Sequence, residues 1–353
     1  HLTRTSLKTA AKAMAAVFHK KYRGIIMLKL AIDFGTAVTK IYKIGSGIVL
    51  SEPTCVTLQK DTGEIRAFGS EAKRLLGKTS DVTEVCFPVY EGEIVDERCA
   101  SALLEYFLRK VVRRTFSVEA LFCVPCACSI ASREKYCRVA RSAGLSRVSF
   151  AETPYLAVLG QDVPLSESNP VFAIDIGAGK TSCAAFSLDG IIAGLTMSVG
   201  GNNMDVHIID HVADTFNLKI GSLTSEKLKN TVGSLIENDN QSTIVNGRDI
   251  TTGKPRSVSV SSADILFPVR IYVDKIIEYA ELVLKKLPAE VSAVMCKNGI
   301  YLAGGVTNIA GFKDYVADRL QMEAHIGNDA QMAIVLGGGR AIGNTALLKR
   351  IEL

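Results

Sequence analysis

The chain has 353 residues, 48% of them hydrophobic, and a formal net charge of +5. This length and composition exclude a disordered or fibrous protein and predict two domains, or one domain split by insertions. Residues 1–26 contain six Lys and Arg and no acidic residue, so they contribute a charge of +6. The charges of residues 27–353 therefore sum to −1. A nucleic-acid-binding protein needs a basic face on its folded body, so we expect no nucleic-acid partner.

The basic leader, residues 1–26, is rich in Ala, Thr and Ser. Three interpretations stay open: a transit peptide, an amphipathic helix at a membrane surface, or upstream sequence that is not normally translated. The apolar face formed by Ala11, Met14, Ala15 and Phe18 is small, which favours the third interpretation over the second. We expect the fold to begin with a strand at Met27.

The nine cysteines are scattered through apolar runs, which predicts reduced thiols in a cytosol rather than disulfides. Cys123, Cys126 and Cys128 include one CxxC spacing, but no second CxxC or His pair completes a set of zinc ligands. Because residues 121–124 form an apolar run, we expect a buried strand there. No stretch approaches the ~18 apolar residues of a membrane-spanning helix.

An internal repeat organises the chain. Residues 30–42 have the pattern of a strand, a tight turn and a strand, and residues 172–184 repeat it 142 positions later. Asp33 and Gly35 in the first copy correspond to Asp175 and Gly177 in the second. The repeat predicts two similar α/β halves produced by duplication, residues 27–170 and 171–353.

The remaining elements follow from hydrophobic periodicity and turn residues. Helical spacing predicts helices at Asp96–Arg114, Arg133–Ser142, Thr153–Gly160, Asp205–Phe216, Ser225–Gly233, Asp264–Leu287 and Phe312–Gln321. Alternation around Asn246-Gly247 predicts a small inserted hairpin at about residues 242–261, with its turn at those two residues. Residues 299–305 predict a strand that ends in a glycine turn. The glycines at 337–339 predict the start of a final helix rather than an anion loop.

Each Asp-x-Gly turn is suited to phosphate. Backbone N–H groups in tight turns bind phosphates, and glycine lets the backbone approach an anion closely. Asp33 and Asp175 stand two residues earlier, where a carboxylate can hold a hydrated Mg²⁺. Two such turns facing one another would bind a triphosphate from both sides. The chain has no GxxxxGK[ST] motif, because Lys180 follows its strand too closely for that loop.

With these turns the chain resembles the superfamily of actin, heat-shock chaperones and sugar kinases, and within it the MreB type of bacterial actin-like, rod shape-determining protein. Further similar segments occur in the same order at Ser46–Pro53, Phe122–Pro125, Asp189–Ile192, Val199–Asp205 and Thr224–Lys229. The resemblance runs from about Met27 to the C-terminus. It implies a duplicated, actin-like (ribonuclease H-like) ATPase fold of the α/β class, with a nucleotide cleft between two lobes.

The resemblance implies ATP with Mg²⁺ as the ligand and assigns a role to each matching position. The first phosphate loop would contain Asp33, Gly35, Thr36, Ala37 and Val38, and the second Gly177, Ala178, Gly179 and Lys180. The rest of the cleft would be formed by Gly200, Gly201, Glu226, Lys227, Leu228, Lys229, Gly304, Gly305 and Val306. Asp33 and Asp175 are the candidate metal ligands, and Glu152 and Asp175 the candidate catalytic residues.

This chain departs from the family pattern inside the site. The family's second loop reads Asp-Ile-Gly-Gly-Gly-Thr-Thr-Glu, whereas here Ala178, Lys180 and Ser182 replace a glycine, a threonine and the glutamate. The glutamate that precedes the helix proline in the family, and that is thought to position the attacking water, is Thr153 here. Losing such a residue can slow phosphoryl transfer by several powers of ten while binding survives. We therefore expect weak hydrolysis, or none.

The resemblance also implies partners and a location. Family members form head-to-tail filaments of identical subunits and lie in the cytoplasm at the inner face of the cytoplasmic membrane, with cell-shape or wall-synthesis proteins as partners. The loop at residues 113–117 is equally consistent with lipid contact and with a solvated helix end. A small-molecule kinase and a non-polymerising nucleotide-binding scaffold of the same superfamily are the alternatives.

Overall fold

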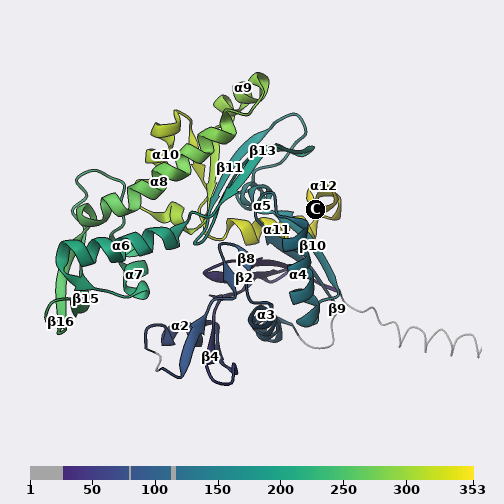
Figure 1. The fold of residues 1–353 in the computed structure, drawn as a ribbon. Helices are drawn as coiled ribbons and strands as arrows, with labels where there is room; N and C mark the ends of the chain where they lie inside the picture. The colour runs from purple at the N-terminus through teal and green to yellow at the C-terminus, as the bar shows by residue number, and fades with distance from the viewer. Residues whose placement is uncertain (1–26, 79–80, 113–116) are drawn as a thin grey trace, which may run out of the picture.

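The structure is a computed structural model that describes residues 27–78, 81–112 and 117–353 (Figure 1). The leader and residues 113–116 of the loop considered for lipid contact lie outside the described residues. Two five-stranded sheets form the centre of the molecule, with helices packed around them. Within the described residues, no helix is both long enough and apolar enough to cross a membrane.

The first large sheet has the strand order β10-β9-β1-β2-β3. Its strands are β1 (Met27–Phe34), β2 (Val38–Lys43), β3 (Gly47–Pro53), β9 (Ser117–Val124) and β10 (Arg147–Glu152). The second has the order β13-β12-β11-β17-β18. Its strands are β11 (Val171–Ile176), β12 (Thr181–Ser187), β13 (Gly190–Met197), β17 (Ile300–Ala303) and β18 (Ala324–Ile326).

The two sheets have the same topology. In the first, β1 is parallel to β9 and antiparallel to β2; in the second, β11 is parallel to β17 and antiparallel to β12. The outer pairs match as well, because β9–β10 and β17–β18 are parallel while β2–β3 and β12–β13 are antiparallel. This correspondence confirms the duplicated α/β fold expected from the repeat.

Smaller elements and helices complete the part of the chain that precedes β11. They are β4 (Val56–Gln59), β5 (Ile65–Phe68), α2 (Gly69–Leu75), β6 (Thr83–Cys86), β7 (Val89–Tyr90), β8 (Glu93–Ile94), α3 (Glu97–Val111), α4 (Ile130–Ser142) and α5 (Thr153–Gly160). Helix α3 begins at Glu97, one residue after the predicted start, and the Asp96 side chain caps it by accepting a hydrogen bond from the Cys99 N–H. The buried strand predicted at residues 121–124 is confirmed as the end of β9.

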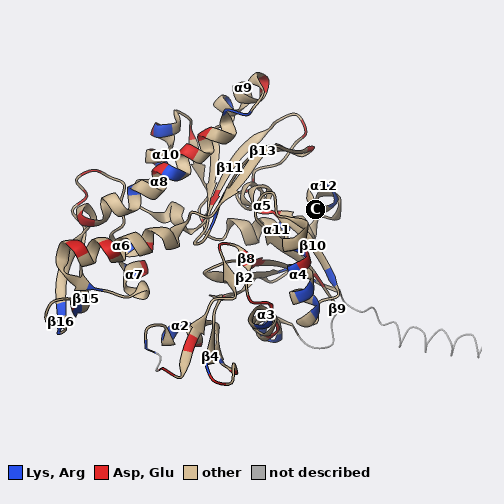
Figure 2. Cartoon of the chain, viewed as in Figure 1, with Lys and Arg blue, Asp and Glu red and all other residues tan. Residues whose placement is uncertain are grey.

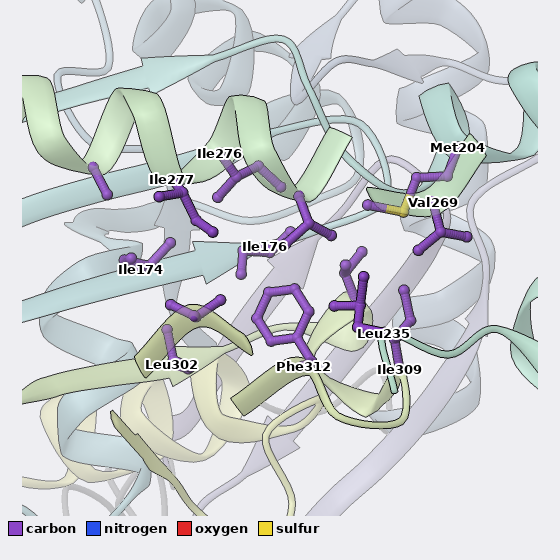
Figure 3. Close-up of a cluster of buried hydrophobic side chains, with 14 of the residues drawn as sticks. Ile174, Ile176, Met204, Leu235, Val269, Ile276, Ile277, Leu302, Ile309 and Phe312 are labelled. Carbon is purple, nitrogen blue, oxygen red and sulfur yellow. The ribbon is translucent and has the colours of Figure 1, made fainter. Parts of the chain in front are cut away.

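The rest of the chain lies mostly around the second sheet, but its last two helices pack on the first. Its further elements are α6 (Gly201–Phe216), β14 (Leu218–Lys219), α7 (Ser222–Val232), β15 (Ser242–Asp249), β16 (Pro255–Ser261), α8 (Ser262–Leu284), α9 (Ala289–Asn298), η1 (Gly305–Asn308), α10 (Phe312–Leu320), α11 (Ala333–Gly343) and α12 (Thr345–Ile351). Figure 3 shows the core between them, where Ile174, Met204, Ile276 and Phe312 converge from β11, α6, α8 and α10. Burying this apolar surface fixes the helices on the sheet. Figure 2 shows acidic and basic residues interspersed on these outer helices.

The inserted hairpin is confirmed, but its turn lies elsewhere than predicted. Strands β15 and β16 pair antiparallel, and Asn246 and Gly247 lie inside β15, opposite Ser257 and Arg256. A Cβ on Gly247 would come within 2.6 Å of the Lys219 carbonyl oxygen in the neighbouring strand β14. The glycine therefore permits a close approach of two backbones rather than a turn.

The prediction that residues 337–339 begin the last helix is wrong. These glycines lie in the middle of α11, where they are buried. A Cβ on Gly337 would lie 2.0 Å from the carbonyl oxygen of Leu156 in α5, and a Cβ on Gly160 would lie 1.9 Å from that of Ala333. Small residues let α5 and α11 pack with their backbones in contact, and that packing rather than helix initiation explains the glycines.

Candidate functional site

Two adjoining cavities lie where the two repeated hairpins meet. Their volumes are about 170 and 290 Å³. Both are lined by Ala37 and Val38 of the first turn and by Gly177 and Ala178 of the second, so they form one continuous cleft. The topology explains this convergence, because β1 and β11 occupy equivalent central positions in their sheets and both turns follow them.

The first cavity contains the two phosphate-type turns and both candidate metal ligands. Its predicted members are Asp33, Gly35, Thr36, Ala37, Val38, Asp175, Gly177, Ala178, Gly179, Lys180, Gly304 and Gly305. The third glycine turn lies close behind β11, since Gly304 has φ +95° and a Cβ there would come within 2.2 Å of the Ile176 carbonyl oxygen. Only glycine fits that position without displacing the strand.

Asp33 is paired with a lysine that the sequence analysis did not select. Lys40 Nζ lies 3.2 Å from Asp33 Oδ2, and the lysine is only 8% exposed. The two residues are direct cross-strand partners in the register of β1 and β2. Opposite charges at directly facing positions of an antiparallel pair attract each other, so the register itself could have identified Lys40.

Asp175 and Thr153 lie together on the other side of this cavity. Burial, and then the negative charge of Asp33, raise the pKa of Asp175 to about 6. The Thr153 hydroxyl is buried beside the Asp175 carboxyl, and its interaction with that carboxyl lowers the pKa of Asp175 against the larger effect of burial. A buried hydroxyl that lines a cavity next to a candidate metal ligand is a polar contact within reach of a bound ligand.

Lys180 joins the second hairpin to the first half of the chain. Its Nζ lies 3.3 Å from Glu93 Oε1, and the other oxygen of Glu93 accepts a hydrogen bond from the Ser132 hydroxyl at 2.7 Å. Close by, the Gly92 N–H donates to the Thr36 hydroxyl at 2.9 Å. Each turn is thus attached to the β7–β8 hairpin, the second by the ion pair to Glu93 and the first by the hydrogen bond from Gly92.

The second cavity is formed largely by one face of α7 and by the start of α6. Glu226, Lys229 and Asn230 line it, as expected for positions three and four residues apart on a helix. Lys229 Nζ lies 2.8 Å from Asp205 Oδ1, and burial nevertheless raises the pKa of Asp205. Lys73 Nζ donates hydrogen bonds to both carboxylate oxygens of Glu226, to Oε1 at 3.0 Å and to Oε2 at 2.8 Å. This pair connects α7 to α2 across the cleft.

Four predicted site residues do not line this cleft. Lys227 and Leu228 lie on the other face of α7, where they line a separate cavity of about 510 Å³. Gly200 caps α6 and packs behind the second turn, where a Cβ would come within 2.6 Å of the carbonyl oxygens of Gly177 and Ala178. Glu152 is 6% exposed and accepts a hydrogen bond from the Ala127 N–H instead. Gly201 and Val306, by contrast, line the second cavity.

Several lining residues were missed by the sequence analysis. Besides Lys40 they include Asn202, Asp205, Asn230, Asn308 and Gln331. Asn202 and Asp205 lie in a segment already recognised as family-like. Asn230 follows Glu226 by four residues on the same helix face, so helical spacing pointed to it. Asn308 ends the short helix η1 and Gln331 lies in the turn before α11, and neither belongs to a periodic pattern, so only the fold brings them to the cleft.

The thiols near the CxxC spacing are not arranged around this cleft as a group. Cys123 and Cys126 are buried, and burial raises the pKa of both thiols, to about 12 for Cys126. Buried thiols with a raised pKa behave as small apolar side chains. Their role in the described structure is packing.

Comparison with known proteins agrees with this geometry. The family model described as MreB/Mbl protein matches residues 27–350. The cell shape-determining protein MreB of Escherichia coli K12 is 30% identical over 331 residues, covering 92% of this chain and 95% of the relative. MreB of Pasteurella multocida is 32% identical, and Mbl of Bacillus subtilis 28%, each over 92% of this chain and 95% and 98% of the relative.

Solved structures show the same fold. MreB5 of Spiroplasma citri bound to ADP superposes with a TM-score of 0.86 at 27% identity, covering 92% of this chain and 98% of that one. The same protein bound to AMPPNP gives the same values. A subunit of the MamK double helical filament has a TM-score of 0.77 at 20% identity, covering 90% and 99%, and at that identity the likeness concerns the fold alone.

Proposed function

The chain belongs to the MreB/Mbl family of actin-like, cell shape-determining proteins, and on this basis we propose that it binds ATP in the cleft between its two hairpins and assembles head to tail into filaments. The observation that carries the proposal is the convergence of both Asp-x-Gly turns on one cleft. The chain would form two lobes, residues 27–170 and 171–353, with the nucleotide between them.

The two cavities suit the two ends of a nucleotide. The glycine-rich first cavity would take the phosphates, and the second, with Glu226 and Lys229, would take the nucleoside. ADP and AMPPNP are the ligands of the Spiroplasma MreB5 structures, which supports an adenine nucleotide here.

Mg²⁺ would accompany the nucleotide. Asp33 and Asp175 line the same cavity, and two carboxylates facing the phosphate site suit a hydrated Mg²⁺. Held by these two carboxylates, the ion would reduce the negative charge of the phosphates. Lys40 already forms an ion pair with the Asp33 carboxylate, whereas it forms none with Asp175. The residues therefore fit one such ion, with Asp175 as the more available ligand.

Hydrolysis would be weak. Thr153 lines the phosphate cavity where the family has a glutamate, and a hydroxyl is a far poorer base for orienting an attacking water. Glu152 is held by the Ala127 backbone and is absent from the cleft lining. Bound ATP would therefore remain unhydrolysed for long periods.

We further propose that the filaments lie in the cytoplasm along the inner face of the membrane and act with cell-shape or wall-synthesis proteins. Family membership supports this placement. The contact segment would come from the leader or from the loop after α3. Co-sedimentation of the full chain with anionic and neutral vesicles tests it, and equal recovery with and without vesicles would contradict it.

Light scattering and pelleting of the full chain with ATP, with ADP and without nucleotide test the central proposal. We expect nucleotide-dependent assembly and a bound nucleotide in the pellet. Binding without assembly would favour the non-polymerising scaffold. Phosphate transfer from ATP to a small metabolite would favour the kinase alternative.

A further inference from the structure

Two lysines lie among the phosphate-binding turns. Asp33, Asp175, Lys40 and Lys180 are the charged side chains that line the first cavity within the described residues. The lysines occupy different positions of the two equivalent hairpins, since Lys40 comes seven residues after Asp33 and Lys180 five residues after Asp175. The other copy has Ser182 and Val38 at the matching positions, so each cation belongs to one hairpin only.

Lys40 forms an ion pair with the carboxylate of Asp33, a candidate metal ligand. Its Nζ is 3.2 Å from Asp33 Oδ2, and the side chains of the two residues are 10% and 16% exposed. The cross-strand register between β1 and β2 holds this pair in place. A divalent cation that approaches Asp33 must displace the ammonium group or share the carboxylate with it, and two cations at one carboxylate repel each other.

Lys180 supplies a second positive charge from the opposite side of the cleft. Its ammonium group rests on Glu93 Oε1 at 3.3 Å, and its side chain passes next to Gly92, where a Cβ would lie 2.6 Å from Lys180 Cδ. Glu93 is 42% exposed in its side chain, so this is a partly solvated and weak ion pair. The flexible stem of a lysine lets the ammonium move from Glu93 to a phosphate oxygen.

We propose that Lys40 and Lys180 supply part of the positive charge for which nucleotide sites of this kind use Mg²⁺, so that this chain binds nucleoside di- and triphosphates with little dependence on Mg²⁺. Two carboxylates without nearby cations repel a polyphosphate until a metal ion intervenes. Here two ammonium groups balance the two carboxylates of the cavity lining, while Glu93, the partner of Lys180, lies outside that lining. The inference rests on the proposed nucleotide binding and adds its charge requirement.

Calorimetric titration of the full chain with ADP and with AMPPNP tests the inference, each in excess Mg²⁺ and in excess EDTA. We expect the affinity to change by less than about tenfold between the two buffers, which corresponds to one unit in log Kd. In the double variant Lys40→Met with Lys180→Thr, the ratio of the Kd in EDTA to the Kd in Mg²⁺ should exceed about tenfold, since the carboxylates then lack their cations. The double variant with Arg at both positions should keep the small ratio.

Lys73→Gln is the matched control. Lys73 is also an ion-paired lysine beside the cleft, but its partner is Glu226 at the nucleoside end. This variant should keep the small Mg²⁺ dependence of the unaltered chain. Thermal melts identify variants that fail to fold, and the single variant Lys180→Thr, at a partly exposed position, then carries the comparison.

The outcomes separate the two proposals. No binding of either nucleotide in either buffer would remove the proposed function itself. Binding in Mg²⁺ that EDTA abolishes in the unaltered chain would overturn the inference and leave nucleotide binding intact. An equal buffer ratio in the unaltered chain and in a folded variant lacking both lysines would also overturn it, because the lysines would then be irrelevant to the metal requirement.

Discussion

Glu152 Oε1 accepts a hydrogen bond from the main-chain N–H of Ala127 at 2.5 Å, and Ala127 adopts the left-handed conformation with φ +58°. The carboxylate thereby stabilises a turn that alanine adopts only at some cost. Burial raises the pKa of Glu152. The residue that the family resemblance suggested for catalysis is thus engaged in holding the segment after β9.

Replacing Glu152 tests this structural role. Glu152→Gln keeps an acceptor for the Ala127 N–H, so we expect a loss of less than about 1 kcal/mol in the free energy of unfolding and no change in ATP turnover. Glu152→Ala leaves the N–H without its partner and should cost about 1–3 kcal/mol. Urea unfolding and a phosphate-release assay measure both. A large loss of turnover in a stable Glu152→Gln variant would return this residue to catalysis.

Thr153→Glu should restore a carboxylate to the phosphate cavity. Thr153 already lines that cavity, beside Asp175. We expect phosphate release to increase by about tenfold or more, a modest part of what a positioned general base contributes. Thr153→Gln is the control, because glutamine has the shape of glutamate without its charge. An increase of equal size in both variants would show that the carboxylate is not responsible.

Asp175 should make stability depend on pH in the nucleotide-free protein. Its pKa is raised to about 6, above the ~3.9 of an unfolded chain, so folding favours the protonated form. The folded state therefore gains stability as pH falls from about 7 towards 4 and loses it as pH rises through 6. Between pH 7.5 and pH 5 the gain from this group is about 1–2 kcal/mol.

Comparison with Asp175→Asn isolates this contribution, since asparagine does not titrate. Urea unfolding of the nucleotide-free protein at pH 5 and pH 7.5 measures it, as the difference between the unaltered chain and the variant. We expect the variant to lack the gain at pH 5. Parallel pH profiles for the two proteins would show that Asp175 titrates normally.

Gly337→Ala should be strongly destabilising. The new methyl group would lie 2.0 Å from the Leu156 carbonyl oxygen, so α5 and α11 would have to separate. Overpacking of this kind costs about 1–3 kcal/mol, and a backbone contact leaves little room to relax. Thermal melts should show a lower Tm than Gly221→Ala, where no atom lies within 4 Å of the new Cβ. Equal melting temperatures would contradict the close packing.

The fold could be predicted because its signal is repeated. Two hairpins with the same Asp-x-Gly turn indicate two equivalent sheets, and the meeting of both turns at one cavity follows from their symmetry. Glycines were harder to interpret. Gly247 lies inside a strand and Gly337 inside a helix, and each lets a neighbouring backbone come close. The sequence alone does not show whether a glycine is needed for a turn or for such a contact.

The remaining differences in the site also have physical causes. Residues 226–229 were assigned to the cleft as one block, but each helical residue turns the side chain by about 100°, which directs Lys227 and Leu228 to the other face. Asn308 ends η1 and Gln331 lies in the turn before α11, both far in sequence from the two Asp-x-Gly turns, and only tertiary packing brings them to the cavities. Helical spacing would have indicated Asn230, and cross-strand register would have indicated Lys40.

The packing of α5 against α11 has a mechanical consequence. The chain passes from the first sheet to the second through α5 and returns through α11, whose successor α12 contacts β10. Both passages lie side by side with their backbones in contact. We expect two adjacent crossings to act as a pivot, about which the two sheets rotate more easily than they slide apart. An opening that admits a nucleotide would then be largely a rotation about these helices, and it would most affect contacts far from them, such as that of Lys73 with Glu226.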